Sequence, residues 1–158
     1  MKRRDFIAGV GGAAAAWPLV ARSQRRAQRP RIAIFHPAIP ANLITETGGG
    51  SAWRAFFAEL RRLGYVEGEN LIIERYSAEG HHERYADLVR EIVTRKPDLI
   101  VTGTNSVVVA FKAATTTIPI VFGLPQDPVN LGLVVSLARP GGNLTGINFF
   151  SKIGRAHV

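Results

Sequence analysis

Five polar residues stand just beyond the ends of apolar runs in this 158-residue sequence. They are His36, Thr104, Asn105, Ser106 and Asp127. Imidazole, hydroxyl, amide and carboxylate groups recognise small polar molecules through hydrogen bonds and charge. In open α/β sheets, such ligands lie in the crevice beyond the carboxyl ends of the strands. The spacing therefore predicts a ligand-binding site assembled from successive strand ends.

The stretch from Thr104 to Ser106 opens a predicted helix, and a helix N-terminus attracts a carboxylate or another anion. Gly103, just before it, lets the backbone approach a ligand closely. Asp127 follows the neighbouring strand and can accept hydrogen bonds from an ammonium group or from hydroxyls. Side by side, the two groups would suit a zwitterionic amino acid. Two simpler interpretations stay open: Asn105 or Ser106 only caps the helix, and Asp127 only fixes the following turn.

Catalytic and cofactor chemistry fit the sequence poorly. Ser106 has no Gly-x-Ser-x-Gly elbow and no placed histidine for nucleophilic catalysis. Residues 103–106 lack the lysine of a phosphate-binding loop, and residues 36–40 lack the glycines of a dinucleotide-binding turn. His81 and His82 are adjacent, so they point to different sides, and the chain has no cysteine to complete a metal site. We therefore predict a binding protein with no catalytic residue, no metal and no cofactor.

The elements that position these residues follow from the hydrophobic pattern. Runs of β-branched residues without polar alternation are typical of strands buried on both faces of a parallel sheet. We expect five strands, over residues 31–35, 71–76, 98–102, 118–122 and 144–148. Apolar residues at helical spacing predict helices over residues 51–63, 82–96, 105–114 and 129–138. This alternation predicts an α/β fold, an open parallel sheet with helices on both faces.

The connection over residues 38–50 is longer than an ordinary strand-to-helix loop. It ends in three glycines, Gly48 to Gly50, and Ser51 is placed to cap the helix that follows. We interpret a connection of this length as either mobile or functional.

The first thirty residues resemble an export signal followed by a leader. A basic head with Arg3 and Arg4 precedes an apolar run rich in Gly and Ala, and small residues at alternate positions end at Ser23. The apolar run is too short to span a bilayer stably. We predict a twin-arginine-type signal peptide over residues 1–23, recognised by the export machinery and removed, then a flexible leader over residues 24–30. A periplasmic location follows; the alternative is an amphipathic or buried N-terminal helix.

The formal net charge of +8 does not predict a nucleic-acid partner. Basic residues crowd the start of the chain: Lys2, Arg3, Arg4, Arg22, Arg25, Arg26, Arg29 and Arg31. The remaining body is close to neutral, whereas nucleic-acid binding needs a basic stripe on a folded face. The absence of cysteine excludes disulfides and thiolate chemistry.

Several motifs, taken in their order along the chain, resemble a known family. They are Met1-Lys-Arg-Arg-Asp-Phe-Ile7, Leu63-Gly-Tyr-Val-Glu-Gly-Glu-Asn70, Thr117-Ile-Pro-Ile-Val-Phe122, Asp127-Pro-Val129 and Ser136-Leu-Ala-Arg-Pro-Gly-Gly-Asn-Leu-Thr-Gly146. Over nearly all of residues 1–150 the chain resembles the substrate-binding proteins of ABC transporters, in the tryptophan/tyrosine-type uptake branch. The resemblance implies one lobe of the type I periplasmic binding protein fold, in which two hinged α/β lobes hold a ligand between them. It also implies a small-molecule ligand, ABC permease subunits as membrane partners, and ligand contacts from the loop after His36, from residues 104–106 and from Asp127.

The family pattern includes a second lobe beyond the first. We therefore interpret residues 31–148 as the N-terminal lobe, and residues 149–158 as the start of the crossover with a non-native tail. Residues 153–158 back-translate to sequencing-adapter DNA, which favours a truncated reading frame; a natural C-terminus is the alternative. The expected function is an exported solute-binding protein for a small polar or amino-acid-like ligand. The alternatives are a periplasmic ligand-sensing domain of a receptor or regulator, and an α/β hydrolase or reductase.

Overall fold

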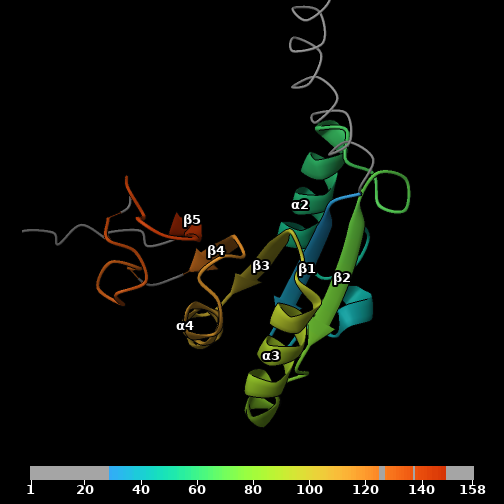
Figure 1. Cartoon of the computed structure of the whole chain (residues 1–158). Helices are drawn as coiled ribbons and strands as arrows, with labels where there is room; N and C mark the ends of the chain where they lie inside the picture. Colours follow the sequence, from blue (N-terminus) through green and yellow to red (C-terminus); the bar gives the residue numbers. More distant parts are fainter. Residues whose placement is uncertain (1–28, 125–126, 137, 149–158) are drawn as a thin grey trace, which may run out of the picture.

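A five-stranded parallel sheet forms the centre of the computed structural model, which describes residues 29–124, 127–136 and 138–148 (Figure 1). The strands are β1 (Arg31–His36), β2 (Ile72–Ser77), β3 (Leu99–Gly103), β4 (Ile120–Leu124) and β5 (Leu144–Asn148). Their order is β2-β1-β3-β4-β5, and every neighbouring pair is parallel. The five predicted strands are present, with bounds shifted by at most two residues. The predicted signal peptide and tail lie outside the described residues.

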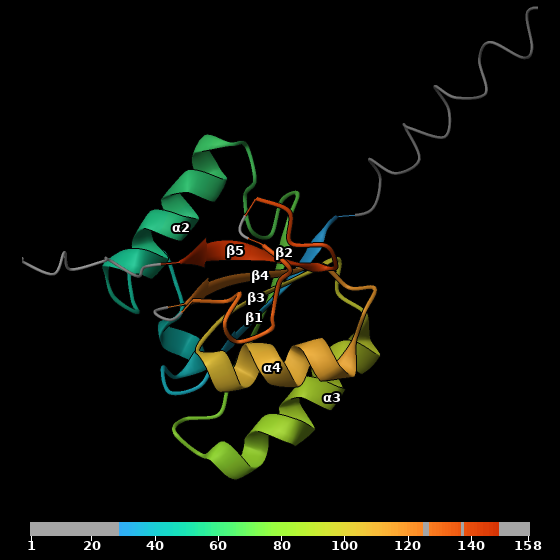
Figure 2. The ribbon, with the colours of Figure 1, turned by 90° about the vertical axis from the view of Figure 1, so that its left-hand side faces the viewer.

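Helices cover both faces of this sheet. The α-helices of the described residues are α2 (Ser51–Arg62), α3 (Tyr85–Arg95) and α4 (Asn105–Ala114), and the 3-10 turns are η1 (Ala41–Leu43) and η2 (His82–Arg84). Figure 2 shows α2 on one face of the sheet, and α3 with α4 on the other. The predicted open parallel sheet with helices on both faces is confirmed. Over the same residues, no helix has both the length and the apolar character needed to cross a membrane.

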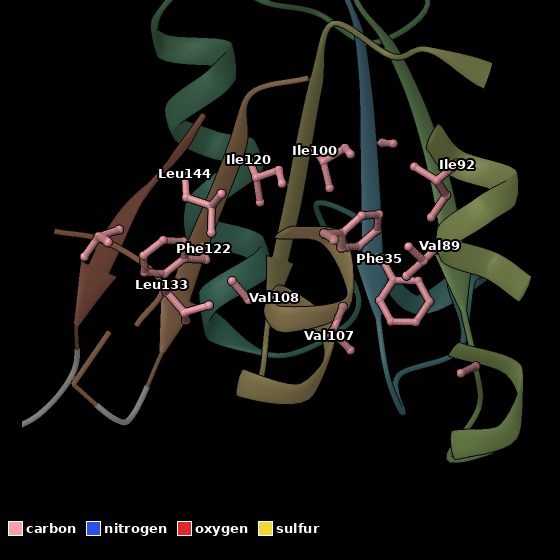
Figure 3. Packing of buried hydrophobic residues seen from close by; sticks show 14 residues of the cluster. Phe35, Val89, Ile92, Ile100, Val107, Val108, Ile120, Phe122, Leu133 and Leu144 are labelled. Atoms are coloured by element: carbon pink, nitrogen blue, oxygen red, sulfur yellow. The ribbon is translucent and has the colours of Figure 1, made fainter. Parts of the chain in front are cut away.

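Each face of the sheet has its own apolar core. On the face of α3 and α4, the Phe35 ring packs edge-on against the rings of Tyr85 and Phe111, with centroids 5.8 and 6.0 Å apart. Figure 3 shows Phe35 in this core with side chains from both helices and from three further strands. On the face of α2, the buried residues are Ile32, Ile34, Ile44, Phe57, Leu71 and Ile73. Because successive strand residues point to opposite faces, β1 is buried on both.

The half of the sheet formed by β4 and β5 is covered on one face only, as far as the described residues extend. Three of its residues are buried on the face of α4: Ile120, Phe122 and Leu144. On the opposite face Thr145 is exposed and Ile147 is 62% exposed. The apolar side chains of α2 pack with β1 and β2 instead, so this helix leaves the other half of the face open.

The predicted helix over residues 129–138 is wrong, because residues 129–136 form turns. Gly132 has a left-handed φ of +63°, which interrupts a right-handed helix. The N–H groups of Leu133 and Val134 both donate to the carbonyl of Pro128, at 2.9 and 3.4 Å. This folded-back loop buries Leu133 and Val134 in the core beside α4. The helix-like apolar spacing therefore belongs to a loop.

Two helix starts also differ from the prediction. The residue ahead of α2 is Gly50, with φ +91°, and no side chain caps this end. Ser51 is therefore the first helical residue and not the cap. The helix expected over residues 82–96 begins as the 3-10 turn η2 and becomes α-helical at Tyr85.

Candidate ligand-binding site

The carboxyl ends of neighbouring strands bring most of the predicted site to one edge of the sheet. The register sets Phe35 of β1 opposite Thr102 of β3. His36, at the end of β1, and Thr104, just after β3, therefore follow adjacent strands. Neighbouring strands in a sheet are about 5 Å apart. The strand β4 pairs with the other side of β3, and Asp127 comes three residues after its end. Sheet topology thus gathers the ends of β1, β3 and β4.

Thr104, between β3 and α4, has an unusual backbone. Its φ is +73° and its ψ is 135°. A β-branched residue rarely adopts this region, and such strain costs on the order of 1–3 kcal/mol. The side chain is exposed and makes no hydrogen bond to the end of α4. Strained residues of this kind cluster at binding sites, so Thr104 marks this edge as a candidate site.

The first turn of α4 presents backbone N–H groups at the same edge. The first N–H groups of any α-helix have no backbone acceptor within that helix. In α4, the N–H of Val108, which follows the first turn, donates to the Thr104 carbonyl at 3.2 Å. No acidic side chain lies in this turn, so nothing within it neutralises the partial positive charge of the helix end. Ser106 is exposed here, and Asn105 is half-buried. This end of α4 can bind a carboxylate.

His36 has one ring nitrogen engaged with the backbone. Its Nδ1 accepts hydrogen bonds from the N–H groups of Ala38 and Ile39, at 3.0 and 2.7 Å. A ring nitrogen that accepts is unprotonated, so the proton of the neutral imidazole is on Nε2. Burial lowers the pKa of His36 below its ordinary value of 6.5, which favours this neutral form. His36 therefore shapes the turn after β1 and has its Nε2–H as the donor for a further partner.

Asp127 fixes the turn that follows it. Its Oδ1 accepts from the N–H of Val129 at 2.9 Å, and its Oδ2 accepts from the side-chain amide of Asn130 at 3.2 Å. This is the simpler of the two interpretations that the sequence left open. Each carboxylate oxygen has a second lone pair, so ligand binding by Asp127 stays a prediction.

Trp53 was not among the predicted site residues, although its ring lies edge-on to His36, with centroids 6.2 Å apart. A Cβ added to Gly49 would come within 3.0 Å of the Trp53 ring and 2.5 Å of the carbonyl oxygen of Leu43. Ile44 is fully buried. The long connection over residues 38–50 is therefore packed against the fold at Ile44 and at Gly49, while Leu43 is exposed. The sequence feature that could have indicated the contact between Gly49 and Trp53 is the glycine triplet of residues 48–50, followed closely by an aromatic residue.

A cavity of about 470 Å³ lies between α2 and β2, and residues 45–47 of the long connection form part of its lining. Two ion pairs line it, Arg61 with Glu46 and Arg75 with Glu67, each with a nitrogen–oxygen distance of 2.5 Å. Apolar side chains of both elements form the rest of its walls. Among the residues described, no group of three or more His, Asp or Glu side chains is placed to hold a metal ion.

Comparison with known families agrees with this architecture. The model for the family described as ABC transporter substrate binding protein matches residues 46–156. The chain belongs to this family. The resemblance seen in the sequence motifs is confirmed, and the family is one of substrate-binding proteins, not a class of enzymes.

The chain matches only part of each relative that it resembles. A tyrosine-binding protein from Clostridioides difficile (strain R20291) is 30% identical over 115 residues, which are 73% of this chain and 33% of that protein. The chain thus spans about a third of the curated relative that it matches.

Solved structures give the same picture. A conserved domain protein from Vibrio cholerae has 31% identity and a TM-score of 0.66, covering 79% of this chain and 40% of that one. The ligand-free, open structure of a substrate binding protein with adhesive properties from Clostridium difficile has 28% identity and a TM-score of 0.66, covering 78% and 40%. An ABC domain from Streptococcus pneumoniae in complex with L-Trp shares the fold, at 23% identity and TM-score 0.63, covering 77% and 39%. The predicted fold, one lobe of a type I periplasmic binding protein, is confirmed.

Proposed function

We propose that this chain is the N-terminal, ligand-binding lobe of an exported substrate-binding protein, which captures a small amino-acid-like molecule and delivers it to an ABC permease in the membrane. The observation that supports this most is the grouping of His36, Thr104 and the first turn of α4 at adjacent strand ends. The ligand class is suggested by the relatives, one of which is a tyrosine-binding protein and another a complex with L-Trp. The periplasmic location is part of the same proposal.

Each group has a distinct role in this proposal. The first-turn N–H groups of α4, with the hydroxyls of Thr104 and Ser106, bind the ligand's carboxylate. The amide of Asn105 adds a donor and an acceptor beside them, and the Nε2–H of His36 donates to a ligand oxygen. Asp127 accepts from the ligand's ammonium group. A lobe that cannot close over its ligand loses the contacts of the second wall, so its affinity is weak.

Titration of the chain with L-tryptophan and tryptamine, followed by ligand-observed NMR, tests this function. The two molecules differ by the carboxylate, which is the group assigned to α4. L-tryptophan is expected to bind with a Kd on the order of 1 mM, or about −4 kcal/mol. Tryptamine is expected to bind at least about tenfold more weakly, a loss of about 1.4 kcal/mol. L-tyrosine and tyramine form a second pair with the same difference. The proposal is contradicted if, in both pairs, the two molecules bind equally or neither binds.

Asp127→Ala tests the ammonium contact, with Asp87→Ala on the exposed side of α3 as the matched control. Affinity for L-tryptophan should fall by at least about tenfold, about 1.4 kcal/mol, in the first variant and stay unchanged in the second. Unchanged affinity in Asp127→Ala would reduce this residue to its role in the turn.

Export is tested separately in cells. Exchange of Arg3 and Arg4 for lysine should block twin-arginine-dependent export, because that route reads the arginine pair. The precursor then accumulates inside the cell, whereas Arg22→Lys, outside the pair, leaves export intact. Normal export of the double variant would exclude the twin-arginine route.

A further inference from the structure

Arg75, on the edge strand β2, joins three separate parts of the fold. Its Nε donates to the carbonyl of Ile44 at 2.6 Å. Its two terminal nitrogens donate to the two carboxylate oxygens of Glu67, at 2.5 and 2.6 Å. The guanidinium also lies over the ring of Phe57 in α2, 5.4 Å from its centroid. The side chain is 19% exposed, and its Nε and both terminal nitrogens each donate to a specific partner.

The Ile44 carbonyl belongs to the connection between β1 and α2. This connection begins directly after His36, and its Gly49 packs on Trp53, whose ring lies beside His36. Within this connection the backbone hydrogen bonds are local, such as the N–H of Leu43 to Pro40 and the N–H of Ile44 to Ala41. Local bonds fix the shape of a loop but not its place on the sheet, which here also depends on the buried Ile44 side chain and on the exposed pair of Glu46 with Arg61 of α2. Arg75 supplies a bond from the sheet itself, and it reaches the middle of the loop.

The two ends of this connection are held as well. His36 fixes the first turn through its Nδ1, and Gly49 fits closely between the Leu43 carbonyl and the Trp53 ring at the far end. A planar guanidinium that bonds a carboxylate through two nitrogens has little rotational freedom left. The hydrogen bond from its Nε to the Ile44 carbonyl therefore holds this part of the connection at a fixed position.

We propose that Arg75 is a positioning residue, which holds residues 38–50 as a preformed wall of the ligand site before any ligand arrives. The proposal rests on the proposed function for the identity of the site, and on the contacts of Arg75 for the mechanism. Preformed walls bind more tightly, because less conformational entropy is lost on binding. Arg75 thus affects affinity without touching the ligand.

The tests use the full chain carrying Trp17→Phe, which leaves Trp53 as its single tryptophan. Trp53 lies against both His36 and Gly49, so its emission reports the position of the loop. Hydrogen–deuterium exchange over residues 41–48 reports local opening. Arg75→Gln removes both the charge and the planar guanidinium. Arg75→Lys keeps the charge and removes the planar guanidinium. Glu67→Gln keeps the bond from Arg75 to Ile44. Arg90→Gln, at the exposed ion pair with Asp87, is the control.

Arg75→Gln and Arg75→Lys should raise exchange over residues 41–48 by about tenfold or more, since a hydrogen bond to a charged group contributes that much. Trp53 emission should shift in both variants, while exchange in β1, β3 and α4 stays as in the parent. Glu67→Gln should give a smaller effect, and Arg90→Gln none. Unchanged exchange over residues 41–48 would overturn the proposal, and so would an equal rise throughout the sheet, which would make Arg75 a general stabilising residue.

Affinity for L-tryptophan, measured on the same variants, separates this proposal from the function beneath it. A several-fold loss in both Arg75 variants, with a folded chain and altered exchange, is the expected result. Altered exchange with unchanged affinity would overturn the positioning role while leaving the ligand assignment in place. Failure of the parent chain to bind would instead contradict the proposed function and with it the role of the wall.

Discussion

The two halves of the sheet are built differently. In the half containing β1 and β2, the central strand β1 is buried on both faces, with Ile34 under α2 and Phe35 under α3 and α4. The half containing β4 and β5 is buried on the α4 face, and its other face exposes Thr145 and Ile147. Side-chain packing therefore determines the position of β1 from both sides, and that of β5 from one.

The edges of the two halves differ in charge as well. At the β2 edge, Glu74 accepts from Arg31 and from the hydroxyl of Tyr76 at 2.8 Å. Burial works to raise the pKa of Glu74, but these hydrogen bonds outweigh it and hold that pKa below its usual range. Burial, with the bond to Glu74, raises the pKa of Tyr76 to about 12. Charged side chains on an edge strand discourage the addition of another strand. The edge strand β5 has no charged residue, so β2 is the protected edge.

The largest expected effect compares one residue type on the same face of both halves. Ile34→Ala leaves a cavity under α2 and should lower the free energy of unfolding by about 2–5 kcal/mol. Ile147→Ala removes a side chain that is 62% exposed and should change it by no more than about 0.5 kcal/mol. Urea unfolding of both variants measures the difference. A loss for Ile147→Ala as large as that for Ile34→Ala would show that the open face of β5 is in fact covered.

The covered face of β5 can be probed through its glycine. A Cβ at Gly146 would overlap the carbonyl and ring of Phe122, whereas a Cβ at Gly142 meets nothing within 4 Å. Gly146→Ala should therefore cost about 1–3 kcal/mol through overpacking, and Gly142→Ala should be near neutral. Thermal unfolding of the two variants tests this contrast. Equal melting temperatures would mean that β5 does not pack on Phe122 as described.

Thr104→Gly should separate stability from binding at the carboxyl edge. Glycine adopts positive φ without strain, so the variant should gain up to about 1 kcal/mol of stability, the lower end of the strain cost. Affinity for L-tryptophan should fall at the same time, because the hydroxyl is lost. A higher urea midpoint with unchanged affinity would remove Thr104 from the site.

The smallest expected effect is a pH dependence from His36. Its lowered pKa means that the unfolded chain gains a proton first as the pH falls. The contribution of His36 to stability is therefore complete above pH 6.5 and is lost as the pH falls below it. We expect the urea midpoint of the parent to drop more than that of His36→Gln when the pH falls from about 7.5 to about 5, a range that spans the ordinary histidine pKa of about 6.5. Parallel pH profiles of the two proteins would contradict the neutral, hydrogen-bonded imidazole.

Most of the fold was predictable because it depends on local patterns. The buried run ending at Gly103 and the helix from Asn105 to Ala114 were recognisable from their apolar residues alone, and strand–helix alternation then placed the strand ends together. The loop around Pro128 was not predictable, because Leu133 and Val134 have helical spacing but are buried by long-range packing. The role of Arg75 was unpredictable for a related reason, since its partner Ile44 is 31 residues away in the sequence.

The most direct test of the account is backbone-amide NMR of the isotope-labelled chain on addition of L-tryptophan, with tryptamine as the control ligand. L-tryptophan is expected to shift the amides of Asn105, Ser106 and Val107 most, with smaller shifts around His36, and tryptamine is expected to leave the first turn of α4 unshifted. Shifts confined to other surfaces, such as the cavity beside Arg75, or identical first-turn shifts with both molecules, would contradict the claim that the carboxyl edge of the sheet binds the ligand's carboxylate.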